Sequence, residues 1–302
     1  MAPLNWRTAR FVVDLSRPQV MAIVNLTPDS FTDGGRAPTI RSAMATCERL
    51  LADGADILDL GAESSRPGAT PVDDEVELAR LLPVLGEAVR LGCPISVDTR
   101  KPAVMRAALD LGADIVNDID ALRAPAALEV VAAHGACGVC LMHMRGTPST
   151  MHEHTDYGDV VAEVAAFLGE RRARLGEAGI AHDRIVVDPG IGFAKTAAQN
   201  LALLARQREL AAVGAPLLVG WSRKSTLARL VGLADVPAAR RTSAQWAALD
   251  AASASAAMLA VERGASIVRV HDVASTVAAL AIRRAAAADN PSPPTGPLAG
   301  KP

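Results

Sequence analysis

The chain has few aromatic residues, few cysteines and no excess of charge of either sign. Aromatic residues make up 3% of its 302 residues, and Lys plus Arg number 31 against 33 for Asp plus Glu, a net charge of −2. We therefore expect no nucleic-acid surface, and no run of like charges indicates an acidic tail. No apolar run approaches the roughly 20 residues that a membrane span needs, so no membrane association is expected. These absences leave a local site to explain the function.

The four cysteines are Cys47, Cys93, Cys137 and Cys140. Cys137 and Cys140 have a metal-like spacing, but they lie in a strand-like run, where residues three apart point to opposite faces. Buried, reduced thiols are therefore expected. The apolar run at 11–13 is too short for the core of a signal peptide. We expect a protein of the reducing cytoplasm.

Short apolar strand patterns alternate with amphipathic helix patterns along almost the whole chain. A Gly-Ala-Asp/Ser-Ile sequence recurs at 54–57, 112–115 and 264–267, each time where a helix is expected to end and a strand to begin. The strands are apolar without strict alternation, which is typical of parallel strands covered by helices. Eight such units in roughly 270 residues predict an α/β fold, a single (β/α)8 TIM barrel. An open doubly wound sheet is disfavoured because no Gly-rich dinucleotide motif follows an early strand.

The expected domain boundaries enclose one barrel. Residues 1–10 are expected to be a flexible N-terminus, residues 11–286 the barrel, and residues 287–302, rich in Pro, Gly and Ser, a disordered tail. Two strand-like pieces at 11–15 and 19–23 are expected to form a small hairpin that leads into the first core strand. The expected helices cover 39–53, 75–91, 103–111, 126–134, 159–178, 199–213, 243–263 and 275–284.

Polar residues stand at the point where each apolar strand pattern ends. In a barrel, the carboxyl ends of all strands face one mouth, where the active sites of this fold lie. Burying many polar groups in one place is costly unless partners are present, and a polar ligand is the natural partner. These residues are Asn25, Asp59, Asp98, Asn117, His143, Asp188, Lys224, Arg269 and His271.

The types of these residues describe the ligand. Asp98, Asn117 and Asp188 offer acceptors, which suit a flat heterocycle that presents several N–H groups, and a carboxylate can accept two parallel hydrogen bonds from such an edge. Arg269 and His271 are two residues apart on a strand, so they share a face. With other donors they form a corner suited to phosphate oxygens. The site so predicted holds a nitrogen-rich ring and more than one anionic group.

Eight motifs occur in a fixed order from about Met21 to Val273: NLTPDSFTDGG, AESSRPGA, SVDTRK, VNDI, LMHMRGTPSTM, DPGIGFAKT, GWSRKS and VRVHDV. Together they resemble the dihydropteroate synthase family. The resemblance implies a transferase that condenses 6-hydroxymethyl-7,8-dihydropterin diphosphate with p-aminobenzoate and releases diphosphate. It also implies a (β/α)8 barrel, a requirement for Mg²⁺ and a homodimer.

The resemblance also implies roles for individual residues. Those implied for the pterin ring are Asp98, Asn117, Met142, Asp188 and Lys224. Those implied for the diphosphate are Asn25, Arg269 and His271, with Asn25 also the magnesium ligand. Those implied for p-aminobenzoate are Phe31, Ser65, Arg66, Pro67, Phe193, Lys224 and Ser225. Those implied for catalysis are Asp33, Lys224, Arg269 and His271.

Two residues depart from the common pattern, and two other functions remain open. Ala62 and Ala194 stand where many family members have Gly, but neither change removes a functional group. One rival is a pterin-binding methyltransferase barrel that passes a methyl group to a corrinoid, and the other is a catalytically silent paralogue. The segment 152–154, His-Glu-His, could hold a metal, although a solvated loop is expected there.

Overall fold

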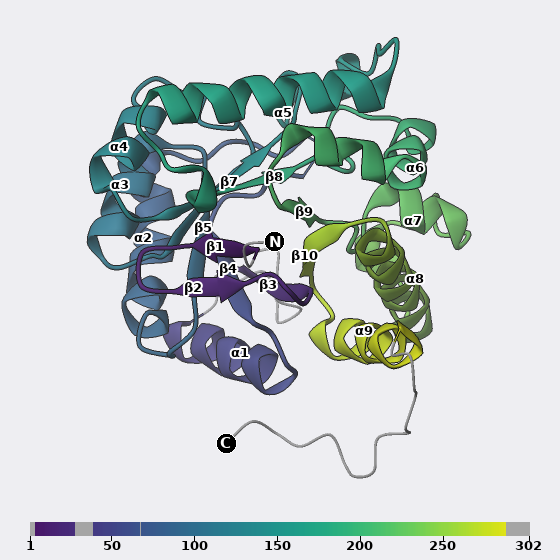
Figure 1. Cartoon of the computed structure of the whole chain (residues 1–302). Helices are drawn as coiled ribbons and strands as arrows, with labels where there is room; N and C mark the ends of the chain where they lie inside the picture. Colours follow the sequence, from purple (N-terminus) through teal and green to yellow (C-terminus); the bar gives the residue numbers. More distant parts are fainter. Residues whose placement is uncertain (1–3, 28–38, 67, 288–302) are drawn as a thin grey trace.

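Eight parallel strands form a closed barrel, and helices surround it (Figure 1). The computed structural model describes residues 4–27, 39–66 and 68–287. Each barrel strand lies beside the next one in the sequence, and the last closes on the first. The strands are β3 (Gln19–Asn25), β4 (Ile57–Gly61), β5 (Ile95–Asp98), β6 (Ile115–Asp118), β7 (Gly138–Met142), β8 (Ile185–Asp188), β9 (Leu217–Val219) and β10 (Ala265–Val270). The predicted (β/α)8 TIM barrel is confirmed.

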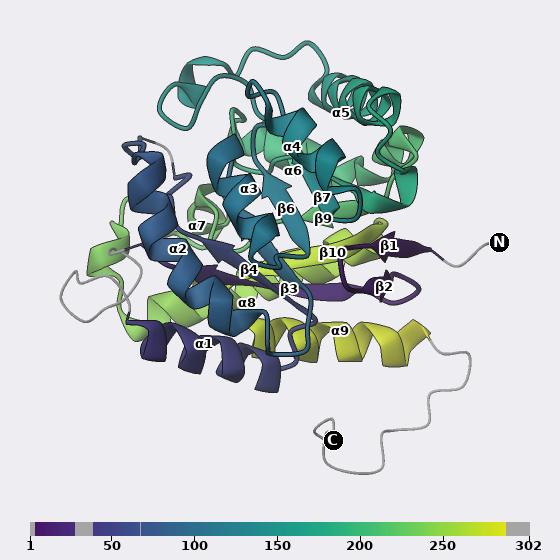
Figure 2. The same ribbon diagram turned by 90° about the vertical axis from the view of Figure 1, so that its left-hand side faces the viewer.

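The helices lie outside the barrel and cover the outer faces of the strands (Figures 1 and 2). They are α1 (Ile40–Ala52), α2 (Asp74–Ala88), α3 (Pro102–Asp110), α4 (Ala127–His134), α5 (Val160–Glu177), α6 (Ala197–Ala205), α7 (Ser225–Leu230), α8 (Ser243–Glu262) and α9 (Val273–Ala287). Short 3-10 turns are η2 (Met151–Glu153), η3 (His182–Arg184), η4 (Gln207–Val213) and η5 (Ala238–Arg240). Every helix expected from the apolar spacing is present, and the one expected over 199–213 is divided into α6 and η4.

The sequence sets where several helices begin. At the start of α6 the Thr196 side chain accepts from the backbone N–H of Gln199, and the Gln199 side chain accepts from Thr196 in return. Thr242 and Gln245 form the same capping box at the start of α8. Pro102 begins α3, where its missing N–H leaves no helical bond unmade. These local signals fix the position of each helix relative to the strand before it.

An antiparallel hairpin of β1 (Asn5–Arg7) and β2 (Val12–Asp14) precedes the barrel. In Figure 2 it lies to the right of the barrel strands, at the amino end of β3. The predicted N-terminal hairpin is confirmed, but its strands are not 11–15 and 19–23, because the segment from Gln19 belongs to the barrel. Residues 5–10, expected within a flexible N-terminus, form β1 and the connection to β2.

Trp6 explains why this segment is ordered. Its side chain is completely buried, and it packs with Val13 and Leu15 against the apolar residues inside the barrel. Its indole Nε1 donates to the carbonyl of Arg184 at 2.9 Å. The burial of such a large side chain stabilises the hairpin against the amino end of the barrel.

The barrel interior changes from apolar to polar within one layer of side chains. The lower layer contains the apolar residues Met21, Ile57, Ile115, Cys140, Val186, Leu218 and Ile267, and one buried polar residue, Ser96 of β5. Residues two apart on a strand point to the same side, so the next layer follows from the sequence. It contains Ile23, Asp59, Asp98, Asn117, Met142, Asp188, Gly220 and Arg269. The site is therefore a charged layer directly above a largely apolar floor.

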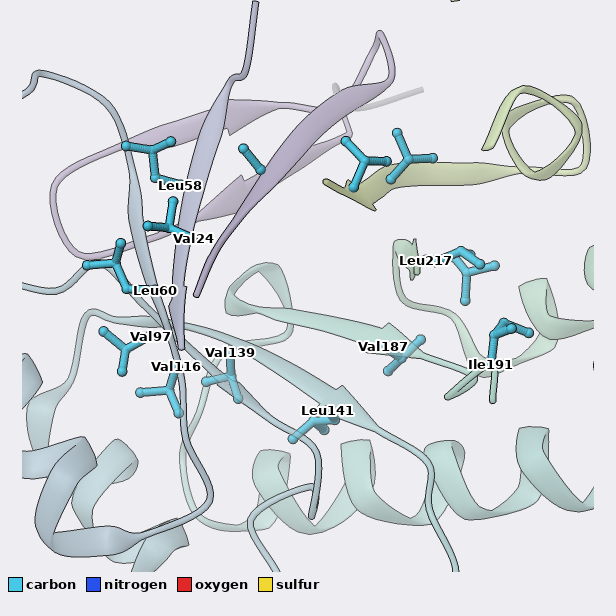
Figure 3. Close-up of a cluster of buried hydrophobic side chains, with 14 of the residues drawn as sticks. Val24, Leu58, Leu60, Val97, Val116, Val139, Leu141, Val187, Ile191 and Leu217 are labelled. Atoms are coloured by element: carbon cyan, nitrogen blue, oxygen red, sulfur yellow. The ribbon is translucent and has the colours of Figure 1, made fainter. Parts of the chain in front are cut away.

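The residues between these positions point outward and pack under the helices. Figure 3 shows this cluster, with the labelled side chains Val24, Leu58, Leu60, Val97, Val116, Val139, Leu141, Val187, Ile191 and Leu217. Cys137 belongs to this outer cluster and Cys140 to the inner one. The two thiols diverge as predicted, and all four cysteines are free.

Three remaining expectations concern the surface and the chain ends. His152 and Glu153 are exposed, as expected for a solvated loop, and the described residues contain no group of three or more His, Cys, Asp or Glu arranged to hold a metal. None of the helices within the described ranges has the length and apolar character that crossing a bilayer requires. The predicted tail lies outside the described residues from position 288 onward.

Trp6→Ala is expected to lower the free energy of unfolding by about 3 to 5 kcal/mol, because it leaves a large cavity between the hairpin and the barrel. Urea denaturation measures this change. Val12→Ala on the same hairpin is the matched control, since Val12 is 63% exposed. Equal effects of the two substitutions would contradict the role assigned to Trp6.

Candidate active site

A buried ion-pair network organises the charged layer. The guanidinium of Arg269 on β10 donates through Nε to Asp59 Oδ2 at 2.6 Å and through Nη2 to Asp98 Oδ2 at 2.6 Å. Asn117 on β6 donates from Nδ2 to the same oxygen of Asp59 at 3.1 Å. Side chains from four strands thus meet inside the barrel, and Asp59 is the shared acceptor.

Asp59 is completely buried, and its second oxygen, Oδ1, has no hydrogen-bond partner among the described residues. An unpaired buried carboxylate oxygen is costly. The charge of Asp59 is therefore stabilised through its other oxygen, Oδ2, by Arg269 and Asn117. Asp59 stood among the strand-end residues of the sequence but received no role there, and the structure makes it central.

Burial changes the charge balance of this layer. It raises the pKa of Asp98, an effect that the neighbouring Arg269 opposes. Burial also raises the pKa of Asp188, although the backbone N–H of Gly190 donates to its Oδ1 at 2.7 Å. Burial lowers the pKa of Lys224 to about 8, with Arg269 adding to the shift. With the pKa of Asp98 raised to about 7 and that of Lys224 lowered to about 8, the protonation of these two groups changes near neutral pH, which is typical of a functional site.

Lys224 lies against the loop that follows β8. Its Nζ is 4.1 Å from the centroid of the Phe193 ring. Gly192 has φ of +81°, and a Cβ there would stand 3.0 Å from Lys224 Cδ, so the position requires glycine. Ala194 has φ of +50°, a left-handed conformation that is strained for a residue with a Cβ. The backbone conformation of this loop thus places the Phe193 ring close to the ammonium group of Lys224.

His271 follows β10 and pairs with the segment after β9. Ser222 Oγ lies 2.9 Å from His271 Nδ1, and the backbone N–H of His271 donates to the same Oγ at 3.1 Å. Burial, with the cations Arg223 and Arg269, holds the pKa of His271 well below its usual value. The imidazole is therefore neutral, and it can offer a hydrogen bond to an anion but not a full charge.

Asp250 and Ser253 of α8 hold the turn that carries Lys224. Arg223 has φ of +57°, and its guanidinium pairs with both carboxylate oxygens of Asp250 at 2.7 and 2.8 Å. Its backbone N–H donates to Ser253 Oγ at 3.0 Å. A strained conformation persists only where its surroundings determine it, and these contacts supply that constraint.

His143 does not join the charged layer, although its position at a strand end suggested it. It follows Met142 on β7 and faces outward, where its ring meets Phe167 edge-on at 4.9 Å. Its Nδ1 lies 2.9 Å from Lys195 Nζ. Burial beside that amine lowers the pKa of His143 to about 2. The sequence pattern could not separate His143 from the inward residues, because both kinds end an apolar run.

Lys195 is a buried residue that the sequence analysis did not single out. Besides His143, its Nζ contacts the carbonyls of Gly190 and Phe193 at 3.0 Å each. Burial lowers the pKa of Lys195 to about 7. These bonds fix the loop after β8 from below, so Lys195 supports the site without facing it.

Comparison with known proteins identifies the family. The family model described as "Pterin binding enzyme" matches residues 21–271. A dihydropteroate synthase of Neisseria meningitidis serogroup B is 48% identical over 287 residues, which cover 93% of this chain and 97% of that protein. The Escherichia coli K12 enzyme is 45% identical over 272 residues, covering 89% and 92%. The chain belongs to the dihydropteroate synthase family.

Solved structures of dihydropteroate synthases have the same fold. The Xanthomonas albilineans enzyme with 4-aminobenzoic acid has a TM-score of 0.86 and 45% identity, and the match covers 96% of this chain and all of that one. The Burkholderia cenocepacia enzyme complexed with 7,8-dihydropteroate has a TM-score of 0.82 and 44% identity, covering 94% and 96%. The barrel and its preceding hairpin are thus those of this family.

The structure brings together most of the residues that the family resemblance assigned to the pterin. Asp98, Asn117 and Asp188 line the charged layer beside Arg269, which the resemblance assigned to the diphosphate, and Met142 of the same layer is buried in a cluster with Phe193. The remaining residues lie around the barrel mouth: Asn25 at the end of β3, half-buried Ser65 and exposed Arg66 after β4, and Ser225 at the start of α7. Phe31, Asp33 and Pro67 lie outside the described residues.

Asp59→Asn is expected to lower the free energy of unfolding by about 3 kcal/mol, because it removes the charge that pairs with buried Arg269. It should also weaken pterin binding, since Arg269 and Asn117 lose their shared anchor. Denaturation and calorimetry with free pterin measure the two effects. Asp183→Asn is the control, because Asp183 pairs with Arg7 on the surface. An unchanged pterin affinity in Asp59→Asn would contradict the role of the network.

Proposed function

We propose that this protein is a dihydropteroate synthase. It condenses 6-hydroxymethyl-7,8-dihydropterin diphosphate with p-aminobenzoate to give 7,8-dihydropteroate and diphosphate. The observation that carries the proposal is the charged layer, in which Asp98, Asn117 and Asp188 lie near a half-buried Lys224 and a fixed Arg269. The family membership supports the same reaction.

The pterin ring binds in the charged layer. A carboxylate at Asp188 accepts two parallel hydrogen bonds from the amino-pyrimidinone edge, as it would from an arginine. Asp98 and Asn117 meet the remaining ring nitrogens. Arg269 is held by two carboxylates, so its guanidinium plane is set before the ligand arrives. Such preorganisation reduces the free energy that binding spends on ordering side chains.

The diphosphate lies at the barrel mouth, near Asn25 and His271. Asn25 ends β3 beside Gly61 of β4, and a Cβ built on Gly61 would stand 4.0 Å from Asn25 Oδ1. A single amide oxygen suits Mg²⁺, which commonly takes few protein ligands and fills its octahedron with phosphate oxygens and water. When bound, the metal would neutralise charge on the diphosphate.

The reaction breaks the bond between the pterin methylene carbon and the diphosphate oxygen. The bonding electrons leave with the diphosphate, where the neutral imidazole of His271 and the cation of Arg269 stabilise the added charge. The electron-rich pterin ring shares the positive charge left on carbon. The neutral aniline nitrogen of p-aminobenzoate then forms the new bond and releases a proton, so no enzyme nucleophile is needed. The exclusion of water by the surrounding loops prevents competing hydrolysis.

The second substrate, p-aminobenzoate, binds above the pterin. Phe193 and the stem of Lys224 offer an aromatic face and a cation close together. Ser65, Arg66 and Ser225 stand around the same mouth and suit its carboxylate. The roles proposed for Phe31 and Asp33 of the first loop, and for Pro67, fall on residues that the structure does not describe.

The assembly and location of the protein complete the proposal. Leu230, Leu259 and Ile282 are large apolar side chains exposed on α7, α8 and α9, which supports a homodimer formed through these helices. Four free cysteines suit the reducing cytoplasm. The molar mass in solution by light scattering tests the dimer.

Purified protein with the pterin diphosphate and Mg²⁺ is expected to form dihydropteroate and to release diphosphate in proportion when p-aminobenzoate is added. A coupled diphosphate assay with product detection measures both. Absence of dihydropteroate would favour a silent paralogue. Methyl transfer to an added corrinoid would favour the methyltransferase rival.

The pH dependence should report Lys224. Because its pKa is lowered to about 8, kcat/KM is expected to fall as the pH rises through about 8, where the amine loses its proton. In Lys224→Arg the side chain stays charged at high pH. The basic limb should therefore move upward in that variant, even if its maximal rate is lower. If kcat/KM fell at the same pH in both proteins, a group other than Lys224 would be responsible for the basic limb.

A further inference from the structure

The second loop, residues 62–73 between β4 and α2, is closed at its base by one carboxylate. Glu63 Oε1, near the start of the loop, accepts from the backbone N–H of Val72 at 3.0 Å. Its other oxygen accepts from Arg100 Nε at 3.1 Å. The side chain of Glu63 is only 11% exposed, so these bonds are shielded from water. Both ends of the loop are therefore tied to a single side chain.

Lys101 holds this closure in place from the neighbouring strand–helix unit. It stands just before α3, and its ammonium contacts three groups, two at the opposite ends of the second loop and one on α2. Nζ lies 3.2 Å from Glu63 Oε1 and 2.8 Å from Glu77 Oε2 on α2, and it also donates to the carbonyl of Val72. Burial by itself would lower the pKa of Lys101. The nearby carboxylates of Glu77 and Glu63 have the larger combined effect, so the pKa of Lys101 is raised above its usual value. The side chain therefore stays charged.

Stability alone does not require this arrangement. Glu77 is 1% exposed and Lys101 13%, and taking such charges out of water costs several kcal/mol per ion. Apolar residues of similar volume could fill the space between α2 and α3 at no loss of stability. Apolar residues could not, however, bind the Val72 carbonyl and the Glu63 carboxylate at the same time. The specific consequence of the charge is thus a fixed path for the second loop.

We propose that Lys101 is a positioning residue for the p-aminobenzoate half of the reaction, acting through Glu63 and Val72 on the second loop. The inference rests on the proposed function, because the loop carries Ser65 and Arg66. Two further contacts hold the loop: Arg80 on α2 donates to the carbonyl of Ala62 at 3.1 Å, and the backbone N–H of Gly68 donates to the carbonyl of Pro148 at 3.2 Å. Without Lys101 the loop base keeps the contacts with Arg80 and Arg100, but it loses the group that joins Glu63 and Val72 to Glu77.

The position of the pterin groups does not depend on this link. Asp98 is fixed by Arg269 and by the pairing of β5 with β4 and β6, inside the barrel. The charge of Glu77 adds to the rise of the Asp98 pKa, and removing Glu77 together with Lys101 leaves the net charge of this region unchanged. Asn117 and Asp188 lie on β6 and β8, strands that do not carry the loop base. A change at Lys101 should therefore affect the two substrates differently.

The test uses Lys101→Met combined with Glu77→Leu, so that neither buried charge is left without its partner. The KM for p-aminobenzoate should rise about tenfold, since displacements near 1 Å have effects of this order or larger. The KM for the pterin diphosphate and the calorimetric affinity for pterin should change less than about twofold. Lys101→Arg, which keeps the charge and can still pair with Glu63 and Glu77, should restore most of the p-aminobenzoate KM.

Arg10→Met is the matched control. Arg10 pairs with the buried carboxylate of Asp114 at 2.6 Å near the amino end of the barrel, away from the mouth. It should lower the Tm and leave the ratio of the two KM values unchanged. Equal rises in both KM values for the Lys101 variant, or no rise, would overturn the inference. A lack of product from the unmodified protein would instead overturn the proposed function, and the inference with it.

Discussion

The pairing of Arg269 with Asp59 and Asp98 is the interaction on which the site depends. Three carboxylates, those two and Asp188, face two cations, Arg269 and Lys224, in one water-poor layer. When all are ionised, one negative charge is in excess, and burial raises the pKa of Asp98 and Asp188 accordingly. A ring edge with several N–H groups would relieve this excess by hydrogen bonding. The excess negative charge of this layer thus supports the proposal that it binds the pterin.

A layer of largely apolar side chains lies directly below the charged layer and separates it from the amino end of the barrel. Trp6 and the hairpin pack against the amino end of the barrel, where the side chains below the charged layer are buried. In such surroundings each hydrogen bond is stronger and each unpaired group more costly. The buried position of Trp6 is part of this arrangement. The N-terminal hairpin is remote from the substrates, and yet it helps to set the dielectric environment in which they bind.

The barrel could be predicted from the sequence because alternating apolar patterns and strand-end polar residues carry its periodicity. The pairing partners could not, since Asp59 lies 58 residues from Asn117 and 210 residues from Arg269. The two Ala-for-Gly changes illustrate the same division. Ala62 is not among the residues with positive φ, and Ala194, with φ of +50°, is. Only the structure shows that alanine is accommodated without a left-handed backbone at position 62 and adopts a strained conformation at position 194.

The residues proposed to bind the pterin lie on strands, and those proposed to bind p-aminobenzoate lie on the segments that follow strands. The groups proposed for the pterin lie on β5, β6, β8 and β10, whose register fixes them, whereas the groups proposed for p-aminobenzoate lie on segments that follow β4, β8 and β9. Each of those segments is held by an at least partly buried cationic side chain: Lys101 at the second loop, Lys195 at the loop with Phe193, and Arg223 beside Lys224. Buried charges can position irregular backbone where regular hydrogen bonding is absent. The proposed p-aminobenzoate pocket therefore depends on cationic side chains that hold loop backbone in place, whereas the backbone of the proposed pterin site is held by the pairing of the strands.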